Sequence, residues 1–297
     1  MTIIDGRKIA QEIIDDLKSR PKPEKFFAAI LVGDNPASVN FIKQKEKTAK
    51  ELGVDFRLYN LSADLKNDGL RDEVRKIAEQ KTCGGVIVQL PLPEHINKHY
   101  ILNVIPREKD VDVLGERALG AFYTGRNPVF PPAVGTVEKI LSTLNLELST
   151  LSVAVVGLGF LVGKPISVWL MDKVKEVILL DKFSDLSVIK SADVVILGAG
   201  QAGLIKPEML KDGAGVIDFG YSVAQAPPRT DADLTLRHGS GQALTNAETK
   251  KISGDFDTNL PAISYQLLNF YTPTPGGTGP ILVAKLFENF YTLNEGK

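Results

Sequence analysis

The stretch Ser152–Pro165, SVAVVGLGFLVGKP, determines the expected fold, because a short apolar run passes directly into closely spaced glycines. A buried parallel strand over residues 153–156 must turn sharply into a helix, whose free N-terminal amides can hold a pyrophosphate, and glycine permits that turn. The spacing is GxGxxxG instead of the stricter GxGxxG, and a plain strand-to-helix turn would also fit it. The glycines are Gly157, Gly159 and Gly163.

A carboxylate strengthens the dinucleotide interpretation. Asp181 lies 24 residues after Gly157, at the end of the apolar run EVILLD. An acidic side chain at the tip of the second strand, about 20 residues after the glycine turn, accepts hydrogen bonds from an adenosine ribose. A solvated aspartate at a strand end is the alternative. Together the two signals predict a Rossmann-type dinucleotide-binding domain.

Composition bounds the class of protein. A chain of 297 residues with 43% hydrophobic content can bury a sizeable core and suggests about two domains. The net charge of -1 gives no electrostatic case for nucleic acid or an anionic membrane, and no signal peptide or run of 18 apolar residues is evident. The one cysteine cannot form an internal disulfide and the histidines lack metal-ligand spacing, so we expect a metal-free cytoplasmic enzyme. These residues are Cys83, His95, His99 and His238.

Strands and helices alternate along the chain, which is typical of parallel sheets. The first half predicts three strands with two helices between them, over residues 26–32, 36–52, 55–61, 70–80 and 85–90. The second half predicts four more strands, over residues 153–156, 177–180, 194–197 and 216–218. We therefore expect an α/β fold of two domains, one formed by residues 1–130 together with 272–297 and the other by residues 131–271.

Two proline-rich segments connect these domains. NPVFPPAV (Asn127–Val134) holds three prolines and predicts a loop that leads into a helix beginning near Gly135. Near the C-terminus the rigid run PTPGG precedes PILVAKLFENFYTLNEGK, for which we expect an amphipathic helix that returns to pack on the first domain. This arrangement would leave a cleft between the domains.

Lys45 is the most unusual residue of the first half. Asn35 suits an N-cap and Pro36 suits the first helical position that follows it. Lys45 then falls within an apolar stripe, four residues after Phe41 and four before Ala49. Such a lysine either extends its ammonium to water or faces a cleft, where desolvation lowers its pKa toward a value useful for proton transfer. The pattern leaves both interpretations open.

Two further segments place polar side chains where a ligand would bind. The strand GGVIVQL ends in QLPLP, so Gln89 is expected at the carboxyl edge of a parallel sheet, where α/β proteins bind ligands. The segment IPREKDVDVLGE is too charged for a core strand, so either Asp110 or Asp112 could face a ligand. An ordinary acidic loop paired with Lys109 is the alternative.

These segments occur together in an order that resembles the methylenetetrahydrofolate dehydrogenase/cyclohydrolase family, the bifunctional FolD-type enzymes. The similar segments are VGDNPAS with Lys45 seven residues past Ser38, ELGV, GVIVQLPLP, IPREKDVD, VVGxGxxVGKP, SADVVILGAGQAGLIKPEMLKDGAGVIDFG, GDFD and TPTPGGTGP. They are collinear over nearly the whole chain, so the joint match is far more specific than any one motif.

The resemblance implies a reaction and its residues. NAD or NADP would oxidise 5,10-methylenetetrahydrofolate to the 5,10-methenyl cation, which water opens to 10-formyltetrahydrofolate in the same cleft. Lys45, hydrogen-bonded to Gln89, would assist water attack and proton movement, and Asp112 would accept hydrogen bonds from the pterin. Positions for substrate and coenzyme follow by the same resemblance: Phe41, Asp112, Pro275, Gly276 and Gly277 for the folate, and Gly157, Leu158, Gly159, Gly163 and Asp181 for the coenzyme. A homodimer formed through the dinucleotide-binding domains is expected on the same ground.

Three departures from the family concern the substrate side of the cleft. Phe41 stands where a tyrosine is usual, so it can stack on the folate but cannot donate a hydroxyl hydrogen bond. The family's DVDG is DVDV here, with the glycine displaced to Gly115. The segment Pro131–Val134, PPAV, replaces a PCTP-like sequence and lacks its threonine.

A fourth departure concerns the coenzyme. The family's GRS turn is replaced by Leu158 and Gly159, so no guanidinium is available for the 2′-phosphate of NADP. Asp181 would repel that phosphate and accept a ribose hydroxyl. Lys164 and Lys182 are near enough in sequence to bind a phosphate instead. We expect NAD to be preferred over NADP.

Other functions fit parts of the sequence. A monofunctional NAD-dependent methylenetetrahydrofolate dehydrogenase would lack the hydrolysis that Lys45 indicates. A non-catalytic folate- or nucleotide-binding relative is favoured by the four departures, since fold does not guarantee function. A shikimate-dehydrogenase-like enzyme shares the domain layout, but QLPLP and TPTPGGTGP have no counterpart in it.

Overall fold

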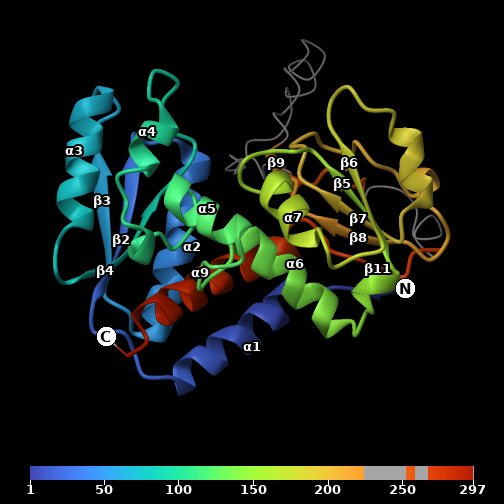
Figure 1. The fold of residues 1–297 in the computed structure, drawn as a ribbon, viewed down its shortest axis with the longest axis horizontal. Helices are drawn as coiled ribbons and strands as arrows, with labels where there is room; N and C mark the ends of the chain where they lie inside the picture. The colour runs from blue at the N-terminus through green and yellow to red at the C-terminus, as the bar shows by residue number, and fades with distance from the viewer. Residues whose placement is uncertain (224–251, 258–266, 297) are drawn as a thin grey trace, which may run out of the picture.

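The computed structural model describes residues 1–223, 252–257 and 267–296, and it forms two α/β units, each built on its own sheet. Figure 1 shows the two sheets at opposite ends of the molecule, with α1, α6 and α9 crossing between them. The bounds of these helices are Gly6–Ser19, Pro132–Thr143 and Thr278–Asn294. The predicted two-domain α/β fold is confirmed, whereas the exact division of the chain into residues 1–130 with 272–297 and 131–271 stays a prediction.

The first unit is a parallel three-stranded sheet in the order β3-β2-β4. All seven residues of β2 are buried, because the helices α2, α3 and α9 pack against the strands of this sheet. Gly53, at φ 66°, ends the helix that follows β2. The elements of this unit are β2 (Phe26–Val32), α2 (Pro36–Leu52), β3 (Phe56–Leu61), α3 (Asn67–Ala78), β4 (Cys83–Val88), α4 (Lys98–Leu102), the 3-10 turn Arg107–Lys109 and α5 (Glu116–Tyr123).

The second unit is a six-stranded sheet in the order β1-β11-β8-β7-β5-β6, and all of its neighbouring strands are parallel. Strand β5 pairs with β6 on one side and with β7 on the other, so the strand order reverses at β5. A ligand site is expected at the carboxyl end of such a reversal point. The strands are β1 (Thr2–Ile3), β5 (Ser152–Val156), β6 (Glu176–Leu180), β7 (Val194–Leu197), β8 (Gly215–Asp218) and β11 (Phe270–Tyr271).

Shorter elements complete this second unit. A two-stranded antiparallel ribbon, β9 with β10, lies outside the main sheet. Helix α7 follows β5, and 3-10 turns connect several of the strands. Their bounds are α7 (Gly163–Leu170), β9 (Ser222–Val223), β10 (Ile252–Ser253) and the turns Leu148–Thr150, Leu186–Ser191 and Pro207–Met209.

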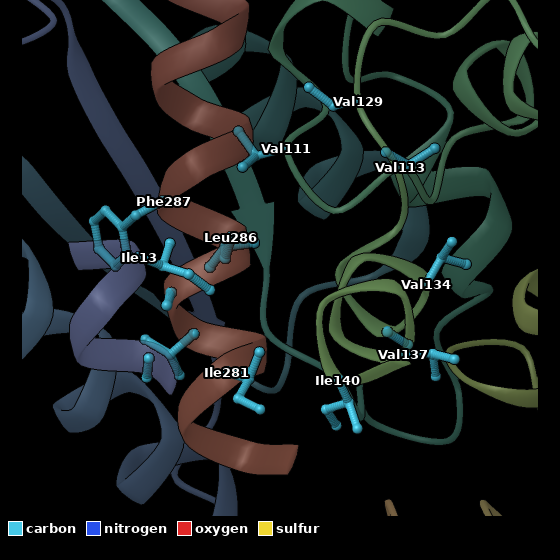
Figure 2. Packing of buried hydrophobic residues seen from close by; sticks show 14 of the residues in the cluster. Ile13, Val111, Val113, Val129, Val134, Val137, Ile140, Ile281, Leu286 and Phe287 are labelled. Atoms are coloured by element: carbon cyan, nitrogen blue, oxygen red, sulfur yellow. The ribbon is translucent and has the colours of Figure 1, made fainter. Parts of the chain in front are cut away.

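Helix α9 was expected to be amphipathic, and that expectation is wrong. None of its residues is exposed, because α1, α2, α6 and β4 all pack against it. Figure 2 shows Ile281 and Leu286 of α9 between Ile13 of α1 and Ile140 of α6. The Phe290 ring stacks on Phe27 of β2, with centroids 4.7 Å apart. The prediction that this helix returns to the first unit is confirmed.

Buried asparagines on α9 satisfy backbone groups of other segments. The Nδ2 of Asn289 donates to the carbonyl oxygens of Val111 and Phe130, at 2.9 and 2.7 Å. The Nδ2 of Asn294 donates to the carbonyl oxygen of Gly84 at 3.0 Å. A buried carbonyl oxygen without a hydrogen bond would be costly, so these amides compensate the burial of the three carbonyl groups.

The helix predicted to begin near Gly135 begins three residues earlier, at Pro132. The ring of proline fixes φ at a helical value and removes an N–H that has no partner in the first turn, so the second of two prolines can start a helix. Gly135 is therefore inside the helix, where a Cβ would lie 2.5 Å from Cε of Lys285 on α9. Residues 127–131 form the predicted loop, and only residues 132–134 of that segment belong to the helix instead.

The described residues were also compared with the requirements of a membrane-spanning helix and of a metal site. Within residues 1–223, 252–257 and 267–296, no helix has the length and apolar character needed to cross a bilayer. In the same ranges no three histidine, cysteine or acidic side chains gather closely enough to hold a metal ion. His238 lies outside the described residues.

Candidate active site between the two units

A pocket lies between the two units and gathers the residues that the sequence singled out in the first half. Its polar lining consists of Lys45, Gln89 and Asp112, and Phe41 lies beside them. The first unit contributes α2, the end of β4 and the loop after residue 110, while Leu161 comes from the glycine turn of the second unit. Helices α6 and α9 complete the wall.

Helix α2 carries Lys45 toward the carboxyl edge of the first sheet. The helix begins where predicted, with the Asn35 side chain accepting hydrogen bonds from the N–H groups of Ala37 and Ser38 at 3.0 and 3.1 Å. The Nζ of Lys45 then donates to Oε1 of Gln89 at 3.0 Å. The ammonium therefore faces the pocket, and the sequence alternative in which it extends to bulk water does not describe this structure.

Gln89 is oriented by its own backbone neighbourhood. It follows β4 directly, and its N–H donates to the carbonyl oxygen of Ile30 at 2.8 Å, which continues the pairing with β2. Its Nε2 donates to the carbonyl oxygen of Leu90 at 2.8 Å. With the amide nitrogen engaged in this way, Oε1 is left to accept from Lys45.

Lys45 and Asp112 influence each other's ionisation. Burial lowers the pKa of Lys45, and the nearby Asp112 carboxylate raises it in part. Burial raises the pKa of Asp112, and the Lys45 ammonium lowers it in part. A desolvated amine whose pKa lies below its usual range can exchange a proton more readily near neutral pH than a lysine in water.

The loop that carries Asp112 is held by its neighbour Asp110. Asp110 is only 2% exposed, and its Oδ2 accepts hydrogen bonds from the N–H groups of Gly115 and Leu114 at 2.7 and 3.0 Å. The alternative of an acidic loop paired with Lys109 is wrong. The Nζ of Lys109 instead donates to the carbonyl oxygens of Ala78 and Gln80, at the end of α3.

Val113 explains how this loop forms without the family's glycine. Its φ is 57°, in the left-handed region that favours glycine, although valine is β-branched and is buried here. Such backbone strain persists only where surrounding contacts fix the conformation. The hydrogen bonds that Asp110 accepts from Leu114 and Gly115, directly after Val113, provide that constraint, and Asp112 still lines the pocket.

The predicted coenzyme residues lie at the end of β5, at the reversal point of the second sheet. Gly157 has φ 89°, and a Cβ there would lie 2.6 Å from backbone atoms of Ala199. A Cβ on Gly163 would lie 2.0 Å from the carbonyl oxygen of Gly157. Only glycine fits either position. At Gly159 the nearest atom, the carbonyl oxygen of Gly198, is 4.0 Å away, so packing does not explain that glycine.

A second pocket adjoins the glycine turn on the side of the first unit. Gly159, Val162 and Gly198 line one wall, and the segment 90–98 lines the other. Leu90, Leu161 and Val162 line both pockets, so the two spaces share a wall. Two ligands bound in them would lie next to each other.

The strand-end acid also lies where the sequence predicted. Asp181 follows β6 directly and is exposed, with its Oδ1 accepting from the N–H of Lys182 at 2.9 Å. The Lys182 ammonium lies over the Phe183 ring, 4.7 Å from the centroid. Leu158 packs against the hydrophobic core. An apolar side chain thus stands where the family has the arginine that could bind a 2′-phosphate.

The loop predicted to close the folate cleft does not itself line the pocket. Gly276 and Gly277 pack instead against the start of α1, where a Cβ on Gly6 would lie 1.7 Å from the carbonyl oxygen of Gly277, and Pro275 is exposed. Gly279, two residues further on, lines the pocket. The role of the predicted loop in binding folate stays a prediction.

The residues that the sequence did not indicate are those that make aromatic contacts across the cleft. The Phe41 ring lies 5.4 Å from the Tyr221 ring of the second unit. The Phe160 ring lies 5.0 Å from the His99 ring, and the Lys98 ammonium lies 5.1 Å from the Phe160 centroid. Each contact joins segments far apart in the chain, and no spacing within one segment signals it.

Comparison with known proteins gives a consistent result. Family models described as "Tetrahydrofolate dehydrogenase/cyclohydrolase, catalytic domain" and "Tetrahydrofolate dehydrogenase/cyclohydrolase, NAD(P)-binding domain" match residues 4–112 and 131–297. The bifunctional protein FolD of Hydrogenobaculum sp. is 31% identical over 296 residues, covering 97% of both chains.

Two solved structures share the whole architecture. The bifunctional FolD methylenetetrahydrofolate dehydrogenase/cyclohydrolase of Campylobacter jejuni superposes with a TM-score of 0.86 at 29% identity, over 99% of both chains. The Trypanosoma brucei methylenetetrahydrofolate dehydrogenase-cyclohydrolase, complexed with NADP and an inhibitor, has a TM-score of 0.85 at 26% identity and covers 99% of this chain and 97% of that one.

The environment of Asp110 predicts a pH dependence of stability. Burial, partly offset by the Gly115 and Leu114 N–H groups, raises the pKa of Asp110 from 3.8 to about 6. Between these values the folded state binds more protons than the unfolded state, so the free energy of unfolding falls as pH rises. Asp110→Asn, which keeps an acceptor and cannot ionise, should reduce this fall by on the order of 1–3 kcal/mol. Urea denaturation between pH 4 and 7 measures it.

The exposed aspartate variant Asp212→Asn serves as the control and should retain the wild-type dependence. Equal pH slopes for Asp110→Asn and the wild type would show that Asp110 does not titrate in this range.

Proposed function

Because the chain belongs to the tetrahydrofolate dehydrogenase/cyclohydrolase family, we propose that it oxidises 5,10-methylenetetrahydrofolate to 5,10-methenyltetrahydrofolate with NAD(P)+ and hydrolyses the product to 10-formyltetrahydrofolate. The observation that carries the proposal is the grouping of Lys45, Gln89 and Asp112 in one pocket that shares a wall with the pocket at the glycine turn. The folate would occupy the first pocket and the nicotinamide coenzyme the second.

The oxidation step requires mainly alignment of donor and acceptor carbons. The coenzyme, when bound, supplies the hydride acceptor. The glycine turn after Gly157 and the start of α7 would hold its pyrophosphate, since the first N–H groups of a helix have no carbonyl partner within that helix. Leu161 and Val162 line both pockets and would hold the two reacting rings in a space from which water is excluded.

The hydrolysis step requires management of a proton. Water that attacks the methenyl carbon loses a proton as the C–O bond forms and the C=N double bond becomes single, and the unprotonated Lys45 amine, favoured by its lowered pKa, would receive that proton. The C–N5 bond then breaks and N5 takes a proton, which gives the 10-formyl product. Gln89 would keep the amine in position. Asp112 would accept hydrogen bonds from the amino-pyrimidine edge of the pterin. Phe41 offers no hydroxyl, so Lys45 and Gln89 form the proton-handling pair without help from that position.

Replacing Lys45 should separate the two steps. Lys45→Met keeps the apolar stem but removes the amine, so methenyltetrahydrofolate should accumulate while reduced nicotinamide still forms. The rate of methenyl hydrolysis should fall by roughly 100-fold to 10,000-fold, the usual contribution of a general acid–base group. Absorbance time courses that follow both species report this directly.

Lys43→Met, on the exposed side of the same helix, is the matched control. If the wild type forms reduced nicotinamide but leaves the methenyl product unhydrolysed, the protein is a monofunctional dehydrogenase. If the wild type forms neither product, it is a non-catalytic relative.

We further propose that NAD is the preferred coenzyme. Asp181 at the tip of β6 would accept hydrogen bonds from the ribose hydroxyls and would repel a 2′-phosphate, while Leu158 offers no positive charge. Of the two lysines near enough in sequence to bind the phosphate, Lys182 instead lies over the Phe183 ring.

Removing the Asp181 carboxylate should shift the preference toward NADP. Asp181→Ser removes the charge and keeps a hydrogen-bonding group, so the ratio of kcat/KM for NADP to that for NAD should rise about tenfold, equivalent to about 1.4 kcal/mol. Steady-state kinetics with both coenzymes measures the ratio. A wild-type enzyme that turns over NADP as well as NAD would contradict the proposal.

A homodimer in the cytoplasm completes the proposal. Strand β6 is an edge of the six-stranded sheet, and Leu179 on it is 43% exposed, so an apolar edge is available to a second copy. A buried free thiol at Cys83 suits a reducing compartment. Light scattering should give a dimer for the wild type and a monomer for Leu179→Lys. Tyr123→Lys, at an exposed aromatic residue of the first unit, is the control and should remain a dimer. A monomeric wild type would exclude the dimer.

A further inference from the structure

Two buried carboxylates lie at the carboxyl edge of the six-stranded sheet, outside both pockets. Asp218 ends β8 and is 1% exposed, and Asp255 is 0% exposed. Neither lines the space around Lys45 or the space beside the glycine turn. Carboxylates are buried at a cost unless hydrogen bonds compensate them, so their partners indicate what they hold in place.

Asp255 holds the segment that follows β7. Its Oδ2 accepts hydrogen bonds from the N–H groups of Ala199 and Gly200 at 2.6 and 2.9 Å. A carboxylate that accepts from two successive backbone amides forms strong, charge-assisted hydrogen bonds in a fixed geometry. This side chain therefore helps to fix the position of residues 199–200.

That segment is the surface on which the glycine turn rests. A Cβ on Gly157 would lie 2.6 Å from both N and Cα of Ala199, so the two backbones are in direct contact. The preceding residue, Gly198, packs on Val162 and lines the pocket beside the glycine turn. A shift of the Ala199 backbone would move the turn that holds the coenzyme.

Asp218 in turn holds Asp255. Its Oδ1 accepts from the N–H of Asp255 at 3.3 Å and from that of Gly220 at 2.7 Å, and its Oδ2 accepts from the N–H of Phe256 at 3.0 Å. Both oxygens accept, as an ionised carboxylate can. Burial, offset in part by these N–H groups, raises the pKa of Asp218 to about 6.

The backbone of Asp218 also anchors the segment that leads into α9. Its N–H donates to Oγ1 of Thr272 at 2.7 Å, and its carbonyl oxygen accepts from Oγ1 of Thr278 at 2.8 Å. Thr278 is the first residue of α9, which lines the Lys45 pocket. Gly220, held by the same carboxylate, precedes Tyr221, whose ring contacts Phe41.

We propose that Asp255 is a positioning residue for the nicotinamide coenzyme, and that Asp218 links this coenzyme-binding segment to the substrate pocket. The inference rests on the proposed function, since it concerns the coenzyme and the folate of that reaction. Asp255 acts through Ala199, Gly200 and the glycine turn. It touches neither reacting molecule.

The two activities of the protein make this proposal testable, because only the oxidation uses a coenzyme. Asp255→Ala should raise KM for the coenzyme 10-fold to 100-fold, while hydrolysis of added methenyltetrahydrofolate stays within twofold of wild type. Misplacement of a binding segment by about 1 Å can produce a loss of this size. Asp255→Asn keeps an oxygen for Ala199 and Gly200 and should restore most of the coenzyme affinity.

Asp218→Asn should behave differently from Asp255→Asn. An amide places an NH2 group against one of the backbone N–H donors that the carboxylate satisfies, so both loops should lose their support. Oxidation and hydrolysis should then fall together. Equal, mild effects of the two asparagine variants would contradict the link that Asp218 is proposed to make.

Asp193→Ala is the matched control. Asp193 accepts from the N–H of Ser152 at 2.8 Å and pairs with Lys211 at 2.5 Å, at the opposite end of the same strands. Its removal should lower the temperature of unfolding without changing the ratio of the two activities. A parallel fall of both activities in Asp255→Ala, or an unchanged coenzyme KM, would overturn the proposal.

A binding measurement separates this inference from the proposed function. NADH fluorescence titration of wild type, Asp255→Ala and Asp255→Asn needs no folate turnover. If the wild type binds NADH but turns over no folate, the proposed reaction fails. Weaker NADH binding by Asp255→Ala than by the wild type would then still support the positioning role, and equal NADH binding by these two proteins would contradict it.

Discussion

Helix α9 has no exposed residue, so its position depends on other elements that cover every side of it. Helices α1 and α6 and the elements α2 and β4 of the first unit provide that cover. The Phe27 and Phe290 rings stack at the centre of this packing. Since burial of such surface is the main favourable term in folding, the contacts of α9 also fix how the elements around the cleft lie relative to one another.

The cleft shows what this rigid packing permits. A lysine and an aspartate are held in a partly desolvated pocket, and a valine keeps a left-handed backbone beside them. Each of these features costs free energy on its own. They persist because neighbouring groups compensate: Gln89 accepts from Lys45, and Asp110 accepts from the N–H groups of Leu114 and Gly115. Strain and burial are concentrated where chemistry requires them.

Much of the fold could be predicted from the sequence because its signals are local. The seven predicted strands lie within two residues of their expected positions, and so do the cap at Asn35 and the glycine turn at Gly157, because each depends on residues close together in the chain. The short strands β1 and β11 of the six-stranded sheet were not predicted, because two residues give no readable periodicity. The character of α9 was misjudged because the sequence does not show that other elements also cover its polar side chains, such as the paired Lys285 and Glu288. Pro132 was assigned to a loop because proline suits both a loop and a first helical turn.

The candidate site was predictable only in part, for a related reason. Lys45, Gln89 and Asp112 each had a local pattern that left an alternative open, and the collinear family resemblance selected among them. Contacts between remote segments had no such pattern. The ring of Tyr221 beside Phe41 and the carboxylate of Asp255 beneath Ala199 depend on how β7, β8 and α2 come together in space. No periodicity within one segment reports that arrangement.

The position of β1 has a consequence for the order in which the chain can fold. Thr2 and Ile3 pair in parallel with Phe270 and Tyr271, so an edge of the six-stranded sheet joins two segments that are far apart in the chain. During synthesis the N-terminal segment leaves the ribosome long before its partner strand exists. The first three-stranded sheet can assemble from neighbouring segments, whereas this edge and the enclosure of α9 must wait until β11 and α9 have been synthesised. The cleft between the units is therefore completed only after the first sheet can form.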